Sequence, residues 1–152
     1  MTEVKSWIDS LKNEFPEIKQ LPDSSGFAMI WVPEQQWLAM ATSLKKSGEY
    51  FFDYLVCITA VDYLTHFTLV YHLESTRYGY RLGVKVDTAG REAAAIDSVA
   101  SLWPSAEFHE REVYDLFGIQ FRNHPDLRRL FLEEGWGYPL RKDYRDDNII
   151  ER

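Results

Sequence analysis

The sequence of 152 residues contains only one cysteine, Cys57, and no long apolar run. A single cysteine excludes a disulfide within the chain and an iron–sulfur cluster that the chain ligates by itself. Cys57 stands in the apolar stretch of residues 54–61, so we interpret it as a small buried hydrophobic residue and not as a reactive thiol. A membrane-spanning helix needs about 18 or more apolar residues in a row, and no run approaches this length. The N-terminal residues are polar and amphipathic, which does not fit a signal peptide.

Basic residues are outnumbered: 17 lysines and arginines stand against 24 aspartates and glutamates, which gives a formal net charge of −7. A general nucleic-acid-binding domain needs a basic face to displace counterions from phosphates. We therefore expect no nucleic-acid partner. Aromatic residues, in contrast, reach 15% of the chain, and these residue types are enriched at protein interfaces.

The common signatures of catalysis are also missing. No Gly-rich dinucleotide loop, P-loop or Gly-x-Ser-x-Gly nucleophile elbow occurs. His109 and Glu110 begin like the zinc-protease motif H-E-x-x-H, but Val113 takes the place of the second histidine. We therefore expect no catalytic residue, metal site or cofactor site in this chain. The alternative is an enzyme that uses His109, Glu110 or Asp115 as acid–base groups, which requires a pocket at these residues. We favour ordinary ionised carboxylates, because arginines are abundant nearby.

The spacing of apolar residues predicts two helices and a strand in the first part of the chain. A helix over residues ~3–14 places Trp7 and Ile8 on one face. Residues 26–32 form a short apolar run that suits a buried strand. Pro33 then stands where the first turn of a second helix tolerates it.

Three strand-like segments follow, rich in β-branched and aromatic residues and joined as hairpins, at residues 52–61, 67–73 and 80–86. Ile96, Val99 and Trp103 then fall at helical spacing and predict a third helix, which Pro104 ends. This order indicates a two-layer α+β fold, with helices on one face of a mixed five-stranded sheet. We assign this core domain to residues 1–104.

The last part of the chain, residues 105–152, is rich in arginine, acidic and aromatic residues. Within it, residues 109–145 hold six of the ten arginines but only one of the seven lysines. Arginine suits bidentate, ring-stacked and partly buried contacts, so we predict a protein-docking surface here, not an independent domain. A helix over residues 105–117 is expected, ended by Gly118 in a left-handed conformation. The alternative for this helix is a solvated surface with weak ion pairs such as Arg111–Asp115.

After this helix the sequence predicts an extended C-terminal arm, because its apolar residues lack helical periodicity. Such an arm must bury itself on its own domain or on another protein. Three blocks of the region form a signature: residues 110–119 (EREVYDLFGI), 124–129 (HPDLRR) and 139–144 (PLRKDY). At these residues the chain resembles the 30-kDa (C-type) subunit of respiratory complex I, the proton-pumping NADH:quinone oxidoreductase. It departs from that family at residues 132–137 (LEEGWG), which lack the family's usual proline.

The resemblance implies a subunit of the hydrophilic arm that carries no cofactor, whereas other chains of the complex hold NADH, FMN, iron–sulfur clusters and quinone. It implies contacts with the 49-kDa (D-type) subunit and proximity to the B-type subunit. Membrane association would come only through other subunits, on the cytoplasmic face of the inner (plasma) membrane if the source is bacterial. The expected partner-binding residues are Glu110, Arg111, Glu112, Tyr114, Asp115, Phe117, Gly118, His124, Pro125, Arg128, Arg129, Trp136, Pro139, Leu140, Arg141, Lys142, Asp143 and Tyr144.

Within this set, we expect Arg111, Arg128, Arg129 and Arg141 to bond partner carboxylates or carbonyl groups. The aromatic anchors would be Tyr114, Phe117, Trp136 and Tyr144. Related subunits also occur in membrane-bound energy-converting hydrogenases and in ferredoxin-dependent complexes. The equivalent subunit of such a complex is therefore the alternative assignment.

Overall fold

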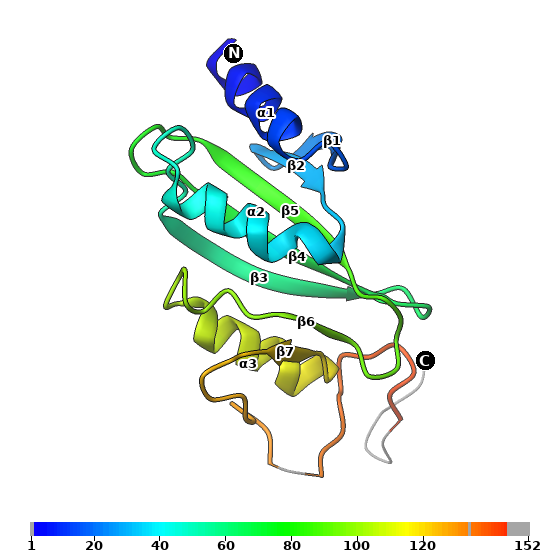
Figure 1. The fold of residues 1–152 in the computed structure, drawn as a ribbon. Helices are drawn as coiled ribbons and strands as arrows, with labels where there is room; N and C mark the ends of the chain where they lie inside the picture. The colour runs from blue at the N-terminus through cyan, green and yellow to red at the C-terminus, as the bar shows by residue number, and fades with distance from the viewer. Residues whose placement is uncertain (1, 134, 146–152) are drawn as a thin grey trace.

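The computed structural model describes residues 2–133 and 135–145 (Figure 1). Three helices and seven strands lie within these ranges: α1 (Thr2–Glu14), β1 (Lys19–Ser24), β2 (Phe27–Trp31), α2 (Glu34–Lys46), β3 (Tyr54–Asp62), β4 (Phe67–Glu74), β5 (Arg81–Asp87), β6 (Ala95–Asp97), α3 (Ala106–Phe117) and β7 (Gln120–Arg122). None of the described helices combines the length and the apolar character needed to cross a membrane.

Five strands form one mixed sheet in the order β1-β2-β5-β4-β3. β2 and β5 pair in parallel, whereas the other neighbours pair antiparallel. β6 and β7 form a separate parallel pair. Figure 1 shows α2 lying across the sheet and α3 lying beside β3. The predicted α+β fold with a mixed five-stranded sheet is confirmed.

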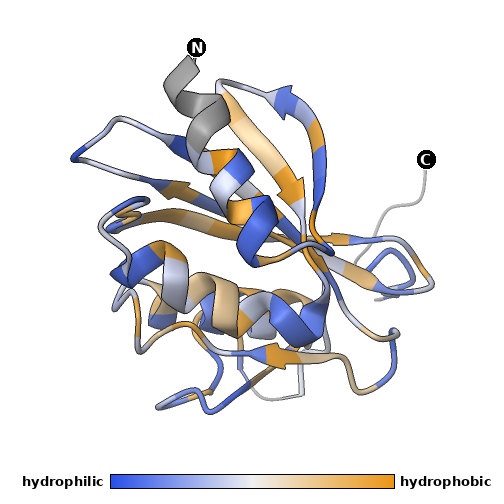
Figure 2. Cartoon of the chain, turned by 45° about the horizontal axis from the view of Figure 1, so that its top comes forward, coloured by the Kyte–Doolittle hydropathy of each residue, from blue (hydrophilic) through white to orange (hydrophobic). Residues whose placement is uncertain are grey.

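The core lies between one face of the sheet and the helices, because alternate strand residues point to the same side. Trp37 of α2 packs against Tyr71 of β4 with 4.5 Å between ring centroids, and Trp7 of α1 stacks on Tyr80 at 5.2 Å. Figure 2 shows most of the central strands in the hydrophobic colour and many connecting loops in the hydrophilic one. α3 joins the same core through Val113. Each large buried side chain of this kind contributes about 1.5–3 kcal/mol to folding.

The predicted third helix over residues 96–103 is wrong. The chain forms β6 there, and its fully buried Ile96 pairs with Phe121 of β7. The backbone then turns, because the N–H of Trp103 donates to the carbonyl oxygen of Val99 at 3.0 Å. Strand and turn both direct apolar residues into the core, and this produces the helix-like spacing.

Strand β1 has no clear signal in the sequence. Most of its residues are exposed, and it contains Pro22, which cannot donate to a neighbouring strand. The pairing with β2 shifts register between Leu21 and Ser24, around this proline. The edge of the sheet tolerates such an irregularity, and β1 occupies that edge.

The last described part of the chain, residues 123–133 and 135–145, contains no helix or strand. We call it the C-terminal segment. It runs past α3, in orange to red in Figure 1, and the N–H of Leu140 donates to the carbonyl oxygen of Leu116 at 3.1 Å. Residues 134 and 146–152 of the predicted arm lie outside the described residues, and the division of the chain at residue 104 stays a prediction.

Candidate functional site

Helix α3 buries three charged side chains. Glu110 and Asp115 are 0% exposed and Arg111 is 6% exposed. Buried charges are costly unless hydrogen bonds or opposite charges compensate them. The solvated-helix alternative is therefore wrong: Arg111 does not pair with Asp115. Arg111 instead donates to the main-chain oxygens of Arg128 at 3.3 Å and Arg129 at 2.9 Å.

Asp115 binds the C-terminal segment with both carboxylate oxygens. Its Oδ1 accepts from Nη1 of Arg129 at 3.1 Å. Its Oδ2 accepts from the main-chain N–H groups of Phe131 at 2.7 Å and Leu132 at 3.1 Å. Hydrogen bonds to a charged acceptor are about twice as strong as neutral ones. One carboxylate thus fixes the backbone turn that follows Arg129.

Arg129 extends this network in the opposite direction. Its Nη1 also donates to the main-chain oxygen of Asp115 at 2.6 Å, and its Nη2 donates to that of Gly137 at 2.9 Å. The guanidinium therefore ties two separate parts of the C-terminal segment to the last turn of α3. This is the planar, multiply bonded geometry for which arginine is better suited than lysine.

Guanidinium groups and aromatic rings alternate in a stack that includes side chains of the C-terminal segment. Arg91 and Arg141 lie over the ring of Phe67, at 5.0 and 5.2 Å from its centroid. Arg141 and Arg129 each lie 4.8 Å from the ring of Tyr138. Contacts of this kind are worth about 0.5–2 kcal/mol each, the more so where water is excluded. The stack connects β4, the loop before β6 and the C-terminal segment.

Gly118 is required by both its conformation and its neighbours. It ends α3 with φ of 78°, as predicted, and its N–H donates to the Tyr114 oxygen. A Cβ at this position would lie 2.7 Å from Nη2 of Arg141 and 2.7 Å from a ring carbon of Tyr138. A side chain would therefore displace the cation–ring stack.

Asp62 anchors the end of the segment at the sheet. It is 3% exposed and accepts hydrogen bonds from Arg91 and from the main-chain N–H groups of Leu64 and Lys142, the latter two at 2.8 Å. Desolvation acts to raise the pKa of Asp62, but these bonds outweigh it and lower the pKa to about 2. Arg91 also donates to Asp143 at 2.6 Å. Sequence reasoning missed Asp62 and Arg91, because their partners are distant in the chain.

Glu110 holds the turn after β6. Its carboxyl group accepts from Ser98 Oγ at 2.6 Å and from the N–H of Val99 at 2.9 Å. Burial raises the pKa of Glu110 to about 7, although both hydrogen bonds act to lower it. The expectation of an ordinary ionised carboxylate is therefore wrong for this residue. His124 lies against it, with Nε2 at 3.7 Å from Oε1 of Glu110.

A cavity that touches α3 does not gather the acid–base groups considered above. It is lined by Glu112, by Thr59 and by apolar residues of β3, α3 and the C-terminal segment, and His109, Glu110 and Asp115 take no part in it. Among the described residues, no group of three or more His, Cys, Asp or Glu is arranged to hold a metal ion.

Several predicted docking residues are thus engaged within their own chain. These are Glu110, Arg111, Asp115, Phe117, Gly118, His124, Arg129 and Arg141. Others face solvent, namely Pro125, Arg128, Trp136, Leu140, Lys142 and Asp143, whereas Glu112, Tyr114, Pro139 and Tyr144 are half-buried. Within the described part of residues 105–145, two large exposed hydrophobic side chains were not in the predicted set: Phe108, 58% exposed, and Phe131, 68% exposed.

The fold and these contacts define a class of protein. It is an α+β chain that fixes its C-terminal segment through buried Arg–carboxylate contacts and leaves large apolar side chains facing solvent. Comparison with known proteins narrows this class. The family model described as respiratory-chain NADH dehydrogenase, 30 Kd subunit, matches residues 30–148. The chain belongs to this family, as its signature blocks suggested.

Individual relatives agree with the family model. The chain is 44% identical over 114 residues to the C-type subunit of NADH-quinone oxidoreductase from Chlorobium phaeobacteroides, a match that covers 72% of this chain. It is 41% identical over 116 residues to the C-type subunit from Chloroherpeton thalassium, covering 74% of this chain. It is 49% identical over 94 residues to the C/D-type subunit from Phocaeicola vulgatus, covering 60% of this chain. The matches span 68%, 48% and 18% of these three relatives, so the chain corresponds to a part of each.

A solved structure shows a similar fold. A chain in the membrane-bound sulfane sulfur reductase, an archaeal respiratory membrane complex, superposes with a TM-score of 0.80 at 25% sequence identity. The superposition covers 93% of this chain and 85% of that one.

Proposed function

We propose that this chain is a structural subunit in the hydrophilic arm of a proton-translocating NADH:quinone oxidoreductase. It docks on the 49-kDa (D-type) subunit, near the B-type subunit, and holds no redox group of its own. NADH, FMN, the iron–sulfur clusters and quinone are bound by other chains. The complex lies at the cytoplasmic face of the inner (plasma) membrane in a bacterium, and other subunits supply its membrane attachment.

The observation that carries this proposal is the use of buried charge to fix a segment without helix or strand. Asp115 and Arg129 together bind main-chain groups of Phe131, Leu132 and Gly137. Around this fixed backbone, Phe131 is 68% exposed and Trp136 is 48% exposed. A rigid segment loses little conformational entropy on binding, and exposed aromatic residues are the usual anchors of interfaces.

The relatives support the identity of the partner. The Phocaeicola vulgatus relative is named as a C/D-type protein, and the matched stretch spans only 18% of its length. In that protein C-type and D-type portions share one polypeptide, which favours direct contact between them. We propose that the same contact forms between separate chains here.

The docking residues then have two kinds of role. Arg111, Arg129 and Arg141 act within the chain by holding the C-terminal segment against α3. Arg128, whose side chain is 66% exposed, is the arginine we assign to a partner carboxylate or carbonyl group. Trp136 and Leu140 provide apolar anchors, and truncation of such an anchor costs about 2 kcal/mol or more in binding. In this arrangement the chain positions its partner and electrons pass only through other subunits.

A second candidate function follows from the structural neighbour. The TM-score between this chain and a chain of the membrane-bound sulfane sulfur reductase is 0.80, so this fold also occurs in another respiratory membrane complex. The chain would then have the same docking role in a complex with a different electron donor and acceptor, such as a hydrogenase-type or ferredoxin-dependent one. The two candidates differ in their neighbouring subunits.

Co-purification separates these candidates. The full-length chain, tagged at one end and expressed at its native level, is isolated in mild detergent, and the bound proteins are identified by mass spectrometry. The proposal expects a D-type subunit together with a flavin-binding NADH dehydrogenase subunit. A D-type homologue with nickel-ligating cysteines, or the absence of the flavin-binding chain, selects the second candidate. Recovery of the chain alone from cells that make the intact complex contradicts both.

A further inference from the structure

Strand β3 presents an open edge. It is the last strand of the five-stranded sheet and pairs only with β4 among the described residues. Its residues 54–61 include no charged residue and no proline, two of the usual protections of an exposed edge. The last residue of the strand, Asp62, is charged but buried. The pairing with β4 is irregular between Leu55 and Cys57, but residues 57–62 keep a regular register. An apolar, regular edge of this kind offers unpaired backbone groups to another extended chain.

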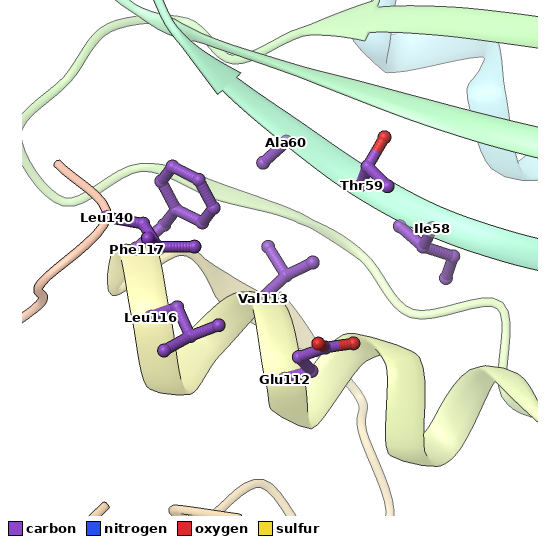
Figure 3. A pocket seen from close by; sticks show the side chains of 8 residues that line it. All are labelled: Ile58, Thr59, Ala60, Glu112, Val113, Leu116, Phe117 and Leu140. Atoms are coloured by element: carbon purple, nitrogen blue, oxygen red, sulfur yellow. The ribbon is translucent and has the colours of Figure 1, made fainter. Parts of the chain in front are cut away.

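A cavity of about 240 Å³ lies directly beside this edge. Ile58, Thr59 and Ala60 of β3 form one wall, and side chains of α3 form the other (Figure 3). The lining is mostly apolar, which suits one or two hydrophobic side chains. The cavity is thus placed where a strand added to β3 would direct alternate side chains.

Glu112 is the one charged residue of the lining. Its carboxylate receives no hydrogen bond or ion pair from any residue that the structure describes. Its negative charge contributes to the raised pKa of Cys57 on the neighbouring strand, after the larger effect of burial. A cation from outside the chain is therefore the complementary group.

We propose that the β3 edge binds an extended segment of the D-type partner as an added strand. That segment places an apolar side chain in the cavity and a lysine or arginine beside Glu112. This inference rests on the proposed function, since it takes the same partner. Leu140 of the C-terminal segment lines the cavity, so the edge and the docking surface are continuous. A second copy of the chain fits less well, because it would bring a net charge of −7 and a second Glu112 to the same edge.

Photo-crosslinking in the assembled complex tests the placement. p-Benzoylphenylalanine is introduced singly at Thr59, at Phe131 of the C-terminal segment, and at Ala39 on the exposed side of α2 as a negative control. The expected result is a crosslink to the D-type subunit from Thr59 and from Phe131, and none from Ala39. A crosslink from Phe131 alone overturns the added strand but leaves the proposed function standing. A crosslink from Thr59 to a second copy or to any other chain also overturns the inference, and no crosslink from either site removes both proposals.

Two further measurements separate a strand from a side-chain contact. Amide hydrogen exchange within residues 57–61 should slow by about tenfold or more in the complex relative to the isolated chain, because a new strand protects edge N–H groups. Unchanged exchange overturns the inference. Glu112→Lys should lower the crosslink yield from Thr59 by about tenfold through like-charge repulsion, while the yield from Phe131 changes little. The crosslink yield from Thr59 in Glu112→Gln should lie between the yields in Glu112→Lys and in the native chain. Equal yields in all three proteins overturn the proposal of a partner cation beside Glu112.

Discussion

Arg129 and Asp115 form a buried pair that joins the C-terminal segment to helix α3. Nη1 of Arg129 lies 3.1 Å from Oδ1 of Asp115, and the two side chains are 9% and 0% exposed. The pair organises main chain as much as it neutralises charge, because the same two side chains bind the backbone of Phe131, Leu132 and Gly137. A segment without helix or strand thereby gains one defined conformation.

Removing the acid of this pair should destabilise the chain strongly. Asp115→Ala leaves the Arg129 guanidinium buried without a countercharge and two N–H groups without an acceptor. We expect a loss of about 3–5 kcal/mol in the free energy of unfolding, measured by urea denaturation. Asp126→Ala is the control, because Asp126 pairs with Arg128 on the surface and such pairs contribute little. Equal losses in the two variants would contradict the role of Asp115.

Gly118→Ala tests the junction between α3 and the segment. The left-handed conformation costs an alanine about 1–2 kcal/mol, and its Cβ would also push against Arg141 and Tyr138. Amide exchange at Leu140 should accelerate, because its bond to Leu116 depends on this packing. Gly48→Ala is the matched control, since a Cβ at Gly48 meets no atom within 4 Å. The melting temperature of Gly118→Ala should therefore be lower than that of Gly48→Ala. Equal melting temperatures would show that the close contacts at Gly118 do not contribute to stability.

Glu110 should give the chain a stability that falls as pH rises. Its carboxyl titrates near 4.5 when unfolded, whereas burial raises its folded pKa to about 7. Between these values the folded state holds a proton that the unfolded state has released, so each rise in pH favours unfolding until the effect levels off above 7. The total is on the order of 3 kcal/mol, at about 1.4 kcal/mol for each pKa unit. In Glu110→Gln the urea midpoint of unfolding should change little between pH 5 and 7. A midpoint that falls with pH as steeply as in the native chain would assign the effect to another group.

Asp62 should act in the opposite direction at lower pH. Its folded pKa is lowered to about 2 from 3.8, so its contribution to stability is complete above pH 3.8 and is lost as the pH falls towards 2. Asp62→Asn keeps only one acceptor oxygen, so one of the N–H groups of Leu64 and Lys142, which bond to different carboxylate oxygens, loses its acceptor. The variant also loses the charge that binds Arg91. The variant should therefore be less stable than the native chain at pH 6 and should lose less on acidification to pH 2. Parallel acid curves for the two proteins would rule out this assignment.

Local pattern was sufficient for much of the fold. The helix that carries Trp37 and the hairpins from β3 to β5 follow from apolar spacing and turn residues close in sequence. The region of Ile96 could not be assigned in this way, because β6 exists only through pairing with β7, and that partner lies beyond α3 in the chain. Helical spacing of Val99 and Trp103 is produced there by a turn.

The candidate site, too, could be predicted only in part from local sequence. Arg-rich composition indicated a surface built for contact, but it could not separate Arg129, which is bonded inside the chain, from Arg128, which is exposed. That distinction depends on long-range partners, as in the hydrogen bond between Asp62 and the main chain of Lys142, 80 residues apart. Burial of Glu110 and Asp115 was equally hidden, since carboxylates next to arginines usually indicate a surface.

The most direct measurement of the docking account is the retention of surface variants in the complex. Phe131→Ala and Trp136→Ala truncate exposed side chains, so the isolated chains should unfold at nearly the native temperature. Each should nevertheless bind the D-type partner about 30-fold more weakly, which is the effect of losing one anchor of about 2 kcal/mol. Tyr78→Ala, which truncates an aromatic residue 42% exposed in the β4–β5 turn, should bind like the native chain. Native gels with titrated partner measure all three, and full retention of the Phe131 and Trp136 variants would contradict the central claim.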